Sequence, residues 1–229
     1  MKKLILSTIA SAALVTASWA GGKLVEPPHV PPVVVDNWSG PYVGLQAGYL
    51  AGKATVTPMS GDAFTLKPNG IAGGLFAGYN WLTPSNLLFG VEADINGVSA
   101  SKSKELFRRD SAYVEPISIY KFEQNWDASL RLRVGGVIED KYLIYATGGA
   151  TWAGVKASYT NALSVTTSEK KTLNGWTLGA GVEMKVTDNV NARLQYRYNS
   201  YSKKQFNLGP SSVKYKNNMI QAGVSYKFN

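Results

Sequence analysis

Apolar residues occupy every second position in eight separate segments of the chain. In the first segment, the odd positions of 43–51 are apolar, and the even positions between them are small or polar. This alternation is typical of a β-strand with one face in an apolar environment and the other in a polar one. The eight segments cover residues 41–51, 71–81, 87–95, 126–134, 142–152, 176–184, 190–198 and 220–228. The pattern predicts an all-β fold.

The links between the predicted strands alternate between long and short. The long links cover residues 52–69, 97–122, 157–173 and 200–216, and the short ones cover residues 83–86, 136–141 and 187–189. In outer-membrane barrels, long loops face the exterior and short turns face the periplasm. The spacing therefore predicts strands that run alternately up and down between the two sides of a membrane.

Aromatic residues of these segments fall into two bands when the strands are threaded up and down. The outer band holds Tyr49, Trp126, Trp152, Trp176 and Tyr198, and the inner band holds Trp81, Phe89, Tyr142, Tyr226 and Phe228. Tyr and Trp side chains favour the two interfaces of a membrane. A periplasmic β-sandwich is the alternative fold, but it has no reason to sort its aromatic residues in this way.

Lipid offers no hydrogen-bond partners, so a sheet that spans a membrane must pair every strand edge and close on itself. An even number of strands permits this closure. We therefore predict a closed eight-stranded antiparallel transmembrane β-barrel over residues 40–229, with four long outer loops and short periplasmic turns.

The N-terminal residues have the features of an export signal. Lys2 and Lys3 precede a short apolar run, and small residues follow up to Ala20. Residues 1–20 are expected to form a signal peptide. Residues 21–39 are expected to form a proline-rich periplasmic leader. Proline has no backbone N–H to donate to a neighbouring strand, and it favours an extended chain. The mature protein is expected in the bacterial outer membrane.

The polar faces of the predicted strands carry seven charged residues that would point into the barrel lumen. They are Glu92, Asp94, Arg131, Arg133, Glu183, Arg193 and Arg197. Side chains can fill the interior of an eight-stranded barrel. Glu183 and Arg193 lie on either side of the turn at Asp188, so we expect them to pair across neighbouring strands. The charges could form a gated ion path or a charge-paired plug, and the narrow lumen favours the plug.

Residue types that carry catalysis are scarce. The single histidine, His29, lies in the leader, and the chain has no cysteine. A Ser-His-Asp arrangement on the barrel and a His/Cys metal site are therefore excluded. Gly179 and Gly181 resemble part of a dinucleotide-binding loop, but no helix follows, so we interpret them as strand glycines that make room in the lumen. We expect no catalytic residue, no metal and no resident cofactor.

The chain is basic, with a formal net charge of +9. An exported protein is not expected to bind nucleic acid, which leaves outer-membrane lipid, lipopolysaccharide or an acidic ligand such as haem as partners. The fourth long link carries a lysine group without opposing acids, formed by Lys203, Lys204, Lys214 and Lys216. These lysines are expected to neutralise lipopolysaccharide phosphates. Alternatively, they would bind haem propionates while loop aromatics cover the haem ring, namely Tyr201, Phe206 and Tyr215.

Several segments resemble the small outer-membrane surface antigens and haemin-binding barrels of alphaproteobacteria. The similar segments are residues 38–44, 129–135, 145–150, 175–183, 187–189 and 195–198. The resemblance covers nearly the whole chain. It implies an eight-stranded barrel in the outer membrane, with haemin binding in some members and a surface-antigen role in others.

Two functions from different classes remain open. The favoured one is a structural surface antigen that contributes to envelope integrity and contacts host surface molecules. The alternative is a haemin-binding protein that captures haem at its basic outer loops. A diffusion porin is disfavoured by the small number of strands, and an enzyme is disfavoured by the missing catalytic residues.

Overall fold

The fold was analysed in a computed structural model, in which the chain divides into two units, Met1–Val35 and Asp36–Asn229. The structure describes residues 38–57, 63–110, 113–161, 163, 165–206 and 211–228, with the backbone alone described at 104–110, 113–118, 161, 206 and 211. The predicted signal peptide and nearly all of the leader lie outside the described residues. No helix within the described ranges is long and apolar enough to cross a membrane.

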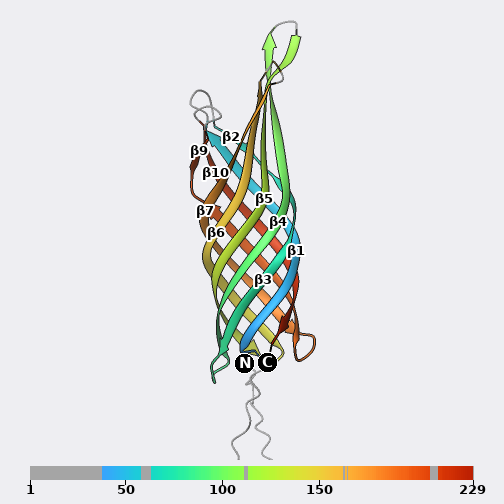
Figure 1. The fold of residues 1–229 in the computed structure, drawn as a ribbon, viewed down its shortest axis with the longest axis vertical. Coiled ribbons are helices and arrows are strands. Elements are labelled where there is room, and N and C mark those ends of the chain that lie inside the picture. The colour runs from blue at the N-terminus through green and yellow to red at the C-terminus, as the bar shows by residue number, and fades with distance from the viewer. Residues whose placement is uncertain are drawn as a thin grey trace, which may run out of the picture. The chain divides into compact units, whose positions relative to one another are not determined.

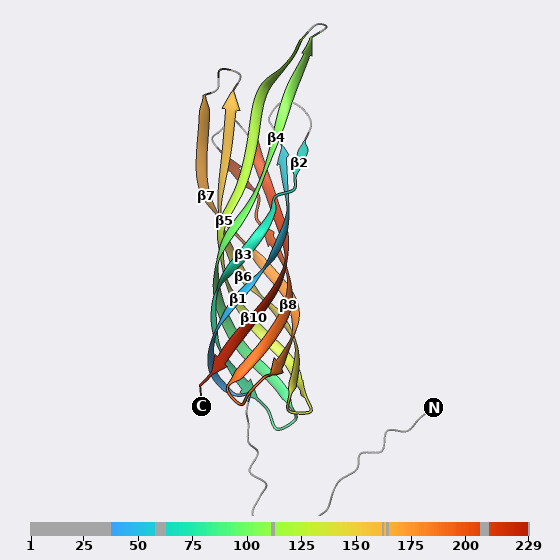
Figure 2. The ribbon, with the colours of Figure 1, turned by 90° about the vertical axis from the view of Figure 1, so that its right-hand side faces the viewer.

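Within the described ranges, eight long strands form one closed antiparallel ring (Figures 1 and 2). In ring order they are β1 (Gly40–Thr57), β3 (Asn69–Leu82), β4 (Leu87–Asp110), β5 (Tyr113–Ile138), β6 (Tyr142–Asn161), β7 (Thr166–Lys185), β8 (Val190–Tyr201) and β10 (Ser211–Lys227). Pairing of β1 with β10 closes the ring. The predicted eight-stranded barrel is confirmed. Two short strands, β2 (Phe64–Leu66) and β9 (Lys204–Phe206), extend the sheet beside β1 and β10.

Alternation of side chains produces an apolar outer surface around the middle of the ring. Along β1, Leu45 is 65% exposed, whereas Gln46 is 5% exposed and faces the lumen. The aromatic residues predicted to form the two bands lie on this outer surface, and Trp81 and Trp176 are about half exposed. Every backbone group of a closed ring has a neighbour, so this surface can face hydrocarbon without unpaired strand edges.

The three short turns occur where the alternation ended. The turn between β5 and β6 has positive φ angles at Glu139 and Asp140, and the Lys141 amide donates to the Ile138 carbonyl over 3.2 Å. Two successive positive φ values are those of a type I′ turn, whose twist matches the twist of the paired strands. Turns of this kind place β5 and β6 side by side with a defined register.

The long links were predicted wrongly as loops over much of their length. Residues 97–122 belong mainly to β4 and β5, which stay paired as far as Asp110 and Tyr113. Likewise β6 and β7 stay paired as far as Thr160 and Thr166. Backbone pairing needs only a neighbouring strand, and it continues after the apolar outer face has ended. The β4–β5 hairpin consequently extends well beyond the other strands (Figures 1 and 2).

The polarity of the two strand faces reverses in these outer extensions. In β1, Lys53 is exposed, whereas Ala54 and Val56 are buried inside the ring. The outward face has become polar and the inward face apolar, as in a barrel surrounded by water. The buried residues form a cluster, the outer core: Ala54, Val56, Leu66, Phe122, Ala153, Val155, Leu173, Tyr201, Val213 and Tyr215. This reversal of polarity was not predicted from the sequence.

A second apolar cluster, the inner seal, lies at the opposite end and consists of Trp38, Leu88, Val137, Leu143 and Tyr145. Trp38 comes from the end of the predicted leader and is 2% exposed. Its indole Nε1 donates to the Asp140 carbonyl over 3.2 Å, and the Lys227 ammonium donates to the Ser39 carbonyl over 3.0 Å. Gly40, with φ of 115°, then turns the chain into β1 in a conformation that favours glycine. The end of the leader is therefore part of the barrel.

Candidate functional site: the charged network of the lumen

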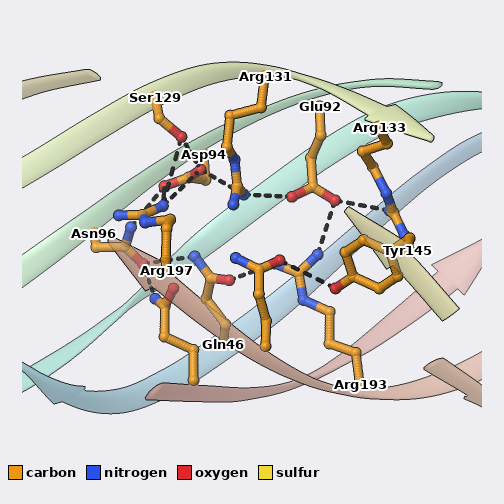
Figure 3. A network of polar contacts seen from close by, with 12 residues as sticks. Gln46, Glu92, Asp94, Asn96, Ser129, Arg131, Arg133, Tyr145, Arg193 and Arg197 are labelled. Carbon is orange, nitrogen blue, oxygen red and sulfur yellow. Dashed lines mark hydrogen bonds and ion pairs between the residues drawn. The ribbon is translucent and has the colours of Figure 1, made fainter. Parts of the chain in front are cut away.

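The seven predicted lumen charges all lie buried inside the ring, between the inner seal and the outer core. They come from four strands: β4 carries Glu92 and Asp94, β5 Arg131 and Arg133, β7 Glu183, and β8 Arg193 and Arg197. Alternation directs each of them inward, because every one is separated from the others on its strand by an even number of positions. Figure 3 shows how the side chains of Glu92, Asp94 and the four arginines converge.

Glu92 is the centre of the inner half of this network (Figure 3). Its carboxylate accepts from Arg133 Nη1 over 2.9 Å and from Arg193 Nη1 over 2.8 Å. Arg131, its register partner on β5, contacts the other oxygen. The Tyr42 hydroxyl from β1 adds a fourth donor at 2.8 Å. Glu92 thus connects side chains from β1, β5 and β8.

Arg197 is the centre of the outer half. Its Nη1 donates to Asp94 over 2.9 Å, and its Nη2 donates to Asp127 over 2.9 Å. Arg131 lies 2.8 Å from Asp94 and therefore joins the outer half to Glu92. Ser129 Oγ also donates to Asp94. The two halves form one continuous set of ion pairs across the lumen.

Asp127 is a further member of the network that was not predicted from the sequence. It is fully buried and lies on the lumen face of β5, next to Trp126, whose side chain is outside. Its inward position was predictable from the alternation, although its contact with Arg197 was not. With Asp127 included, the network of described residues has equal numbers of carboxylates and guanidinium groups: Glu92, Asp94, Asp127 and Glu183 against Arg131, Arg133, Arg193 and Arg197.

This balance matters because an unpaired charge in a region shielded from water is costly, whereas a paired and hydrogen-bonded one is tolerated. Neutral side chains add further hydrogen bonds to the network. Gln46 Oε1 accepts from Arg193, its Nε2 donates to Asn96 over 2.7 Å, and Asn96 Nδ2 donates to Asp127 over 2.9 Å. Gln46 and Asn96 were not predicted to belong to the network, although their inward positions in the alternating strands could have indicated it.

Glu183 and Arg193 were expected to pair across neighbouring strands, and they do form an ion pair, although each of them has a closer partner. They are register partners on β7 and β8, but their closest charged atoms are 4.0 Å apart. Glu183 pairs more closely with Arg133, at 2.8 Å. The guanidinium of Arg193 lies 3.3 Å from the centre of the Phe76 ring and contacts Glu92, on the other side of the lumen. Long arginine side chains thus bypass the nearest acid across the turn.

Double-mutant cycles should separate these two pairs. We expect a coupling free energy of roughly 1–3 kcal/mol between Arg133 and Glu183, and a markedly smaller one between Arg193 and Glu183, because directly bonded neighbours couple most strongly. The variants would be Arg133→Gln, Arg193→Gln and Glu183→Gln, alone and combined, unfolded by urea in detergent micelles. A larger coupling for Arg193 with Glu183 would contradict the observed pairing.

The lysines and tyrosines of the fourth outer link, which were predicted to contact lipopolysaccharide or haem, differ in their exposure to solvent. Lys203, Lys204 and Lys214 are exposed, and Lys216 is partly exposed with its ammonium 5.8 Å from the centre of the Tyr198 ring. Tyr201 and Tyr215 were predicted to cover a haem ring from the loop, and this is wrong. They are 2% and 0% exposed, respectively, and stack on each other in the outer core with ring centres 5.4 Å apart. The side chain of Phe206 lies outside the described residues.

Tyr201 and Tyr215 are buried because the strands that carry them stay paired beyond the apolar outer band. Tyr201 ends β8, and Tyr215 lies in β10, paired with Ala54 of β1. Both are at inward positions of strands that continue past the apolar outer band. Their rings fill the lumen there and leave only the lysines on the surface. In the described part of the chain, no group of three or more His, Asp or Glu residues is placed to hold a metal ion.

A closed antiparallel ring with an apolar outer band and a paired, charged interior defines a small outer-membrane β-barrel protein. The chain belongs to the family described as outer membrane protein beta-barrel domain, which it matches over residues 7–228. This match, together with the relatives described next, confirms the predicted location in the bacterial outer membrane and the relation to alphaproteobacterial barrels.

Two relatives illustrate the similarity. The chain is 30% identical over the full length of both chains to the 31 kDa outer-membrane immunogenic protein of Brucella melitensis biotype 1. It is 34% identical to the 22 kDa outer membrane protein of Rhizobium leguminosarum bv. viciae, with 84% of this chain and 79% of that protein covered. Among solved structures, the outer membrane protease OmpT from Escherichia coli matches with a TM-score of 0.52 and 11% identity, covering 82% of this chain and 96% of OmpT. That last similarity concerns the fold alone.

Proposed function

We propose that the protein is a structural surface barrel that stabilises the outer membrane and presents its extended hairpins to the exterior, without conducting ions and without catalysis. The observation that carries this proposal is the filled lumen. Side chains occupy it in successive layers, from the inner seal through the ion-pair network to the outer core.

The layers support a closed barrel in a specific way. Trp38 and Leu143 cover the periplasmic end, and the Tyr145 ring lies 4.2 Å from the guanidinium carbon of Arg133, so the seal and the network are in contact. On the outer side of the network, Met219 and Leu50 belong to a further buried apolar cluster. An ion crossing the barrel would have to separate ion pairs and pass three apolar clusters.

The same packing supports a role without catalysis. The carboxylates of the lumen are held by arginine side chains, and the apolar layers exclude a substrate from them. The extended β4–β5 hairpin supports surface presentation, because it reaches furthest from the ring (Figure 2). The Brucella relatives are named as immunogenic proteins of the outer membrane, which is consistent with exposure to a host.

The test of this function uses a strain that lacks the protein. We expect its outer membrane to admit more of a normally excluded dye, and a plasmid copy of the wild-type chain to restore the barrier. Unchanged dye entry in the deletion strain would contradict a role in envelope integrity.

Purified protein in planar lipid bilayers supplies the second measurement. We expect no stepwise conductance, either from the wild type or from a Trp38→Ala variant, because the network and the outer core still block the lumen when the seal is weakened. Stepwise currents from the wild type would overturn the closed-barrel part of the proposal. Currents from Trp38→Ala but not from the wild type would show that the network and the outer core do not block ions once the inner seal is weakened.

A further inference from the structure

A pocket of about 290 Å³ opens on the outer wall of the barrel, where β5, β6 and β7 leave the apolar band. It lies outside the lumen and shares no residue with the charged network. It is lined by Asn125 and Trp126 of β5, Gly154 and Val155 of β6, and Lys170, Lys171 and Thr172 of β7, of which Lys171 is paired with Glu169. Three neighbouring strands therefore contribute to one hollow on the surface.

A β-bulge and a glycine create this hollow. The register between β5 and β6 shifts between Gln124 and Trp126, so Asn125 is the extra residue of a bulge. Bulges redirect side chains and are frequent beside functional sites. Gly154 lies beneath the Trp126 indole, and a Cβ on Gly154 would come within 2.0 Å of the Trp126 Nε1 position. The absent side chain allows the indole to lie flat along the wall of the pocket.

The groups around the pocket are mainly hydrogen-bond donors. Within the described ranges, the Trp126 indole makes no hydrogen bond, although its residue is only 37% exposed. The Asn125 amide and the Thr172 hydroxyl are exposed beside it, and the Lys170 ammonium adds a positive charge. Donors from three strands with one cation are suited to an anion with several oxygen atoms.

A second observation points to an anion independently. Lys156 on β6 and Lys170 on β7 are register partners on the outward face. Like charges directly opposite each other on neighbouring strands destabilise a sheet. Among the described residues, neither lysine has a carboxylate within 4.0 Å. Glu123, the register partner of Lys156 on β5, pairs with Lys121 at 2.8 Å, and Glu169 pairs with Lys171 at 2.9 Å. An anion bound beside both ammonium groups would remove the repulsion.

The height of the pocket identifies the source of this anion. Gly154 lies two positions outward of Trp152 on β6, about 7 Å along the strand. Trp152 and Trp176 belong to the outer aromatic band, and such bands lie at the level of the lipid headgroups. In the outer leaflet of this membrane, the phosphorylated headgroup of lipopolysaccharide reaches that level.

We propose that the pocket binds a phosphate of the lipopolysaccharide headgroup, with Lys170 in its lining and Lys156, the register partner of Lys170 beside the pocket, as cations and with Trp126 and Asn125 as neutral donors. The site depends on the location in the outer membrane but not on the closed lumen, so failure of one proposal leaves the other intact. A fixed lipid contact on the outer wall would attach the barrel to its leaflet.

The test measures binding of diphosphorylated lipid A to the full-length mature protein refolded in detergent micelles. The double variant Lys156→Gln with Lys170→Gln should bind about 30-fold more weakly than the wild type, since each lysine near an anionic headgroup contributes about a factor of five. The matched control is Lys53→Gln with Lys102→Gln, which removes the same charge from exposed lysines outside both the pocket and the lysine group of the fourth link and should change the affinity about twofold at most. Trp126→Phe should weaken binding several-fold.

Two reference ligands separate the alternatives. Lipid A stripped of its phosphates should bind all the variants equally weakly, and inorganic phosphate should bind the wild type far more weakly than lipid A does. Without ligand, the Lys156→Gln, Lys170→Gln double variant should be at least as stable as the wild type, because a repulsion is removed. An equal loss of affinity in both double variants, or equal binding of phosphorylated and stripped lipid A, would overturn the proposal. Equally tight binding of inorganic phosphate would reassign the pocket to a free anion.

Discussion

A Glu92→Gln variant should lose about 3–5 kcal/mol of unfolding free energy, because removing one partner from a buried ion-pair network leaves uncompensated charge. Glu92 contacts Arg131, Arg133 and Arg193, and it accepts a hydrogen bond from Tyr42. The amide keeps the size of the side chain but not its charge, so packing changes little. Urea unfolding in detergent micelles, followed by tryptophan fluorescence, measures the loss.

Two comparisons make this result specific. Glu139→Gln removes the same charge from an exposed turn and should change stability by less than about 0.5 kcal/mol. Combining Glu92→Gln with Arg193→Gln restores the charge balance and should recover part of the lost stability. An unfolding midpoint of Glu92→Gln equal to that of the wild type would show that water, rather than the arginines, compensates the carboxylate.

A Tyr215→Ala variant should lose about 3–5 kcal/mol, the cost of truncating a large aromatic side chain in a packed core. The Tyr215 ring is fully buried, its centre is 5.0 Å from that of Phe122, and its hydroxyl donates to Gln124 over 2.7 Å. Stability is not uniform across a protein, so the outer extensions should open before the membrane-embedded part. Limited proteolysis of the variant in lipid vesicles should therefore cut the extensions and leave a protected barrel fragment.

Neighbouring substitutions supply the controls. Lys214→Ala, next to Tyr215 but exposed, should change stability by less than about 0.5 kcal/mol. Tyr215→Phe retains the ring, loses one hydrogen bond and should cost about 1 kcal/mol. If Tyr215→Ala were as stable and as resistant to protease as the wild type, the outer part of the barrel would be the set of loops that the alternation pattern predicted.

The sequence by itself determined the barrel. Each strand that crosses the membrane has lipid on one face and a polar lumen on the other, so the environment changes at every residue and leaves a period of two in the chain. The same alternation identified the inward charges, such as Glu92 and Arg197, and the short turns, such as the one at Asp140. These features depend on local position along one strand, which a linear sequence records directly.

Only the tertiary structure decided which charges pair and how far the barrel extends. Arg133 lies fifty positions from Glu183 and still reaches it, because closure of the ring brings β5 and β7 to one lumen and a long side chain has several acids within range. The inward burial of Tyr201 and Tyr215 depended on a ladder that continues where the outward residues become polar. Lipid imposes an apolar outer face only within the membrane; beyond it, pairing with neighbouring strands sets the length and the core, and those neighbours are distant in sequence.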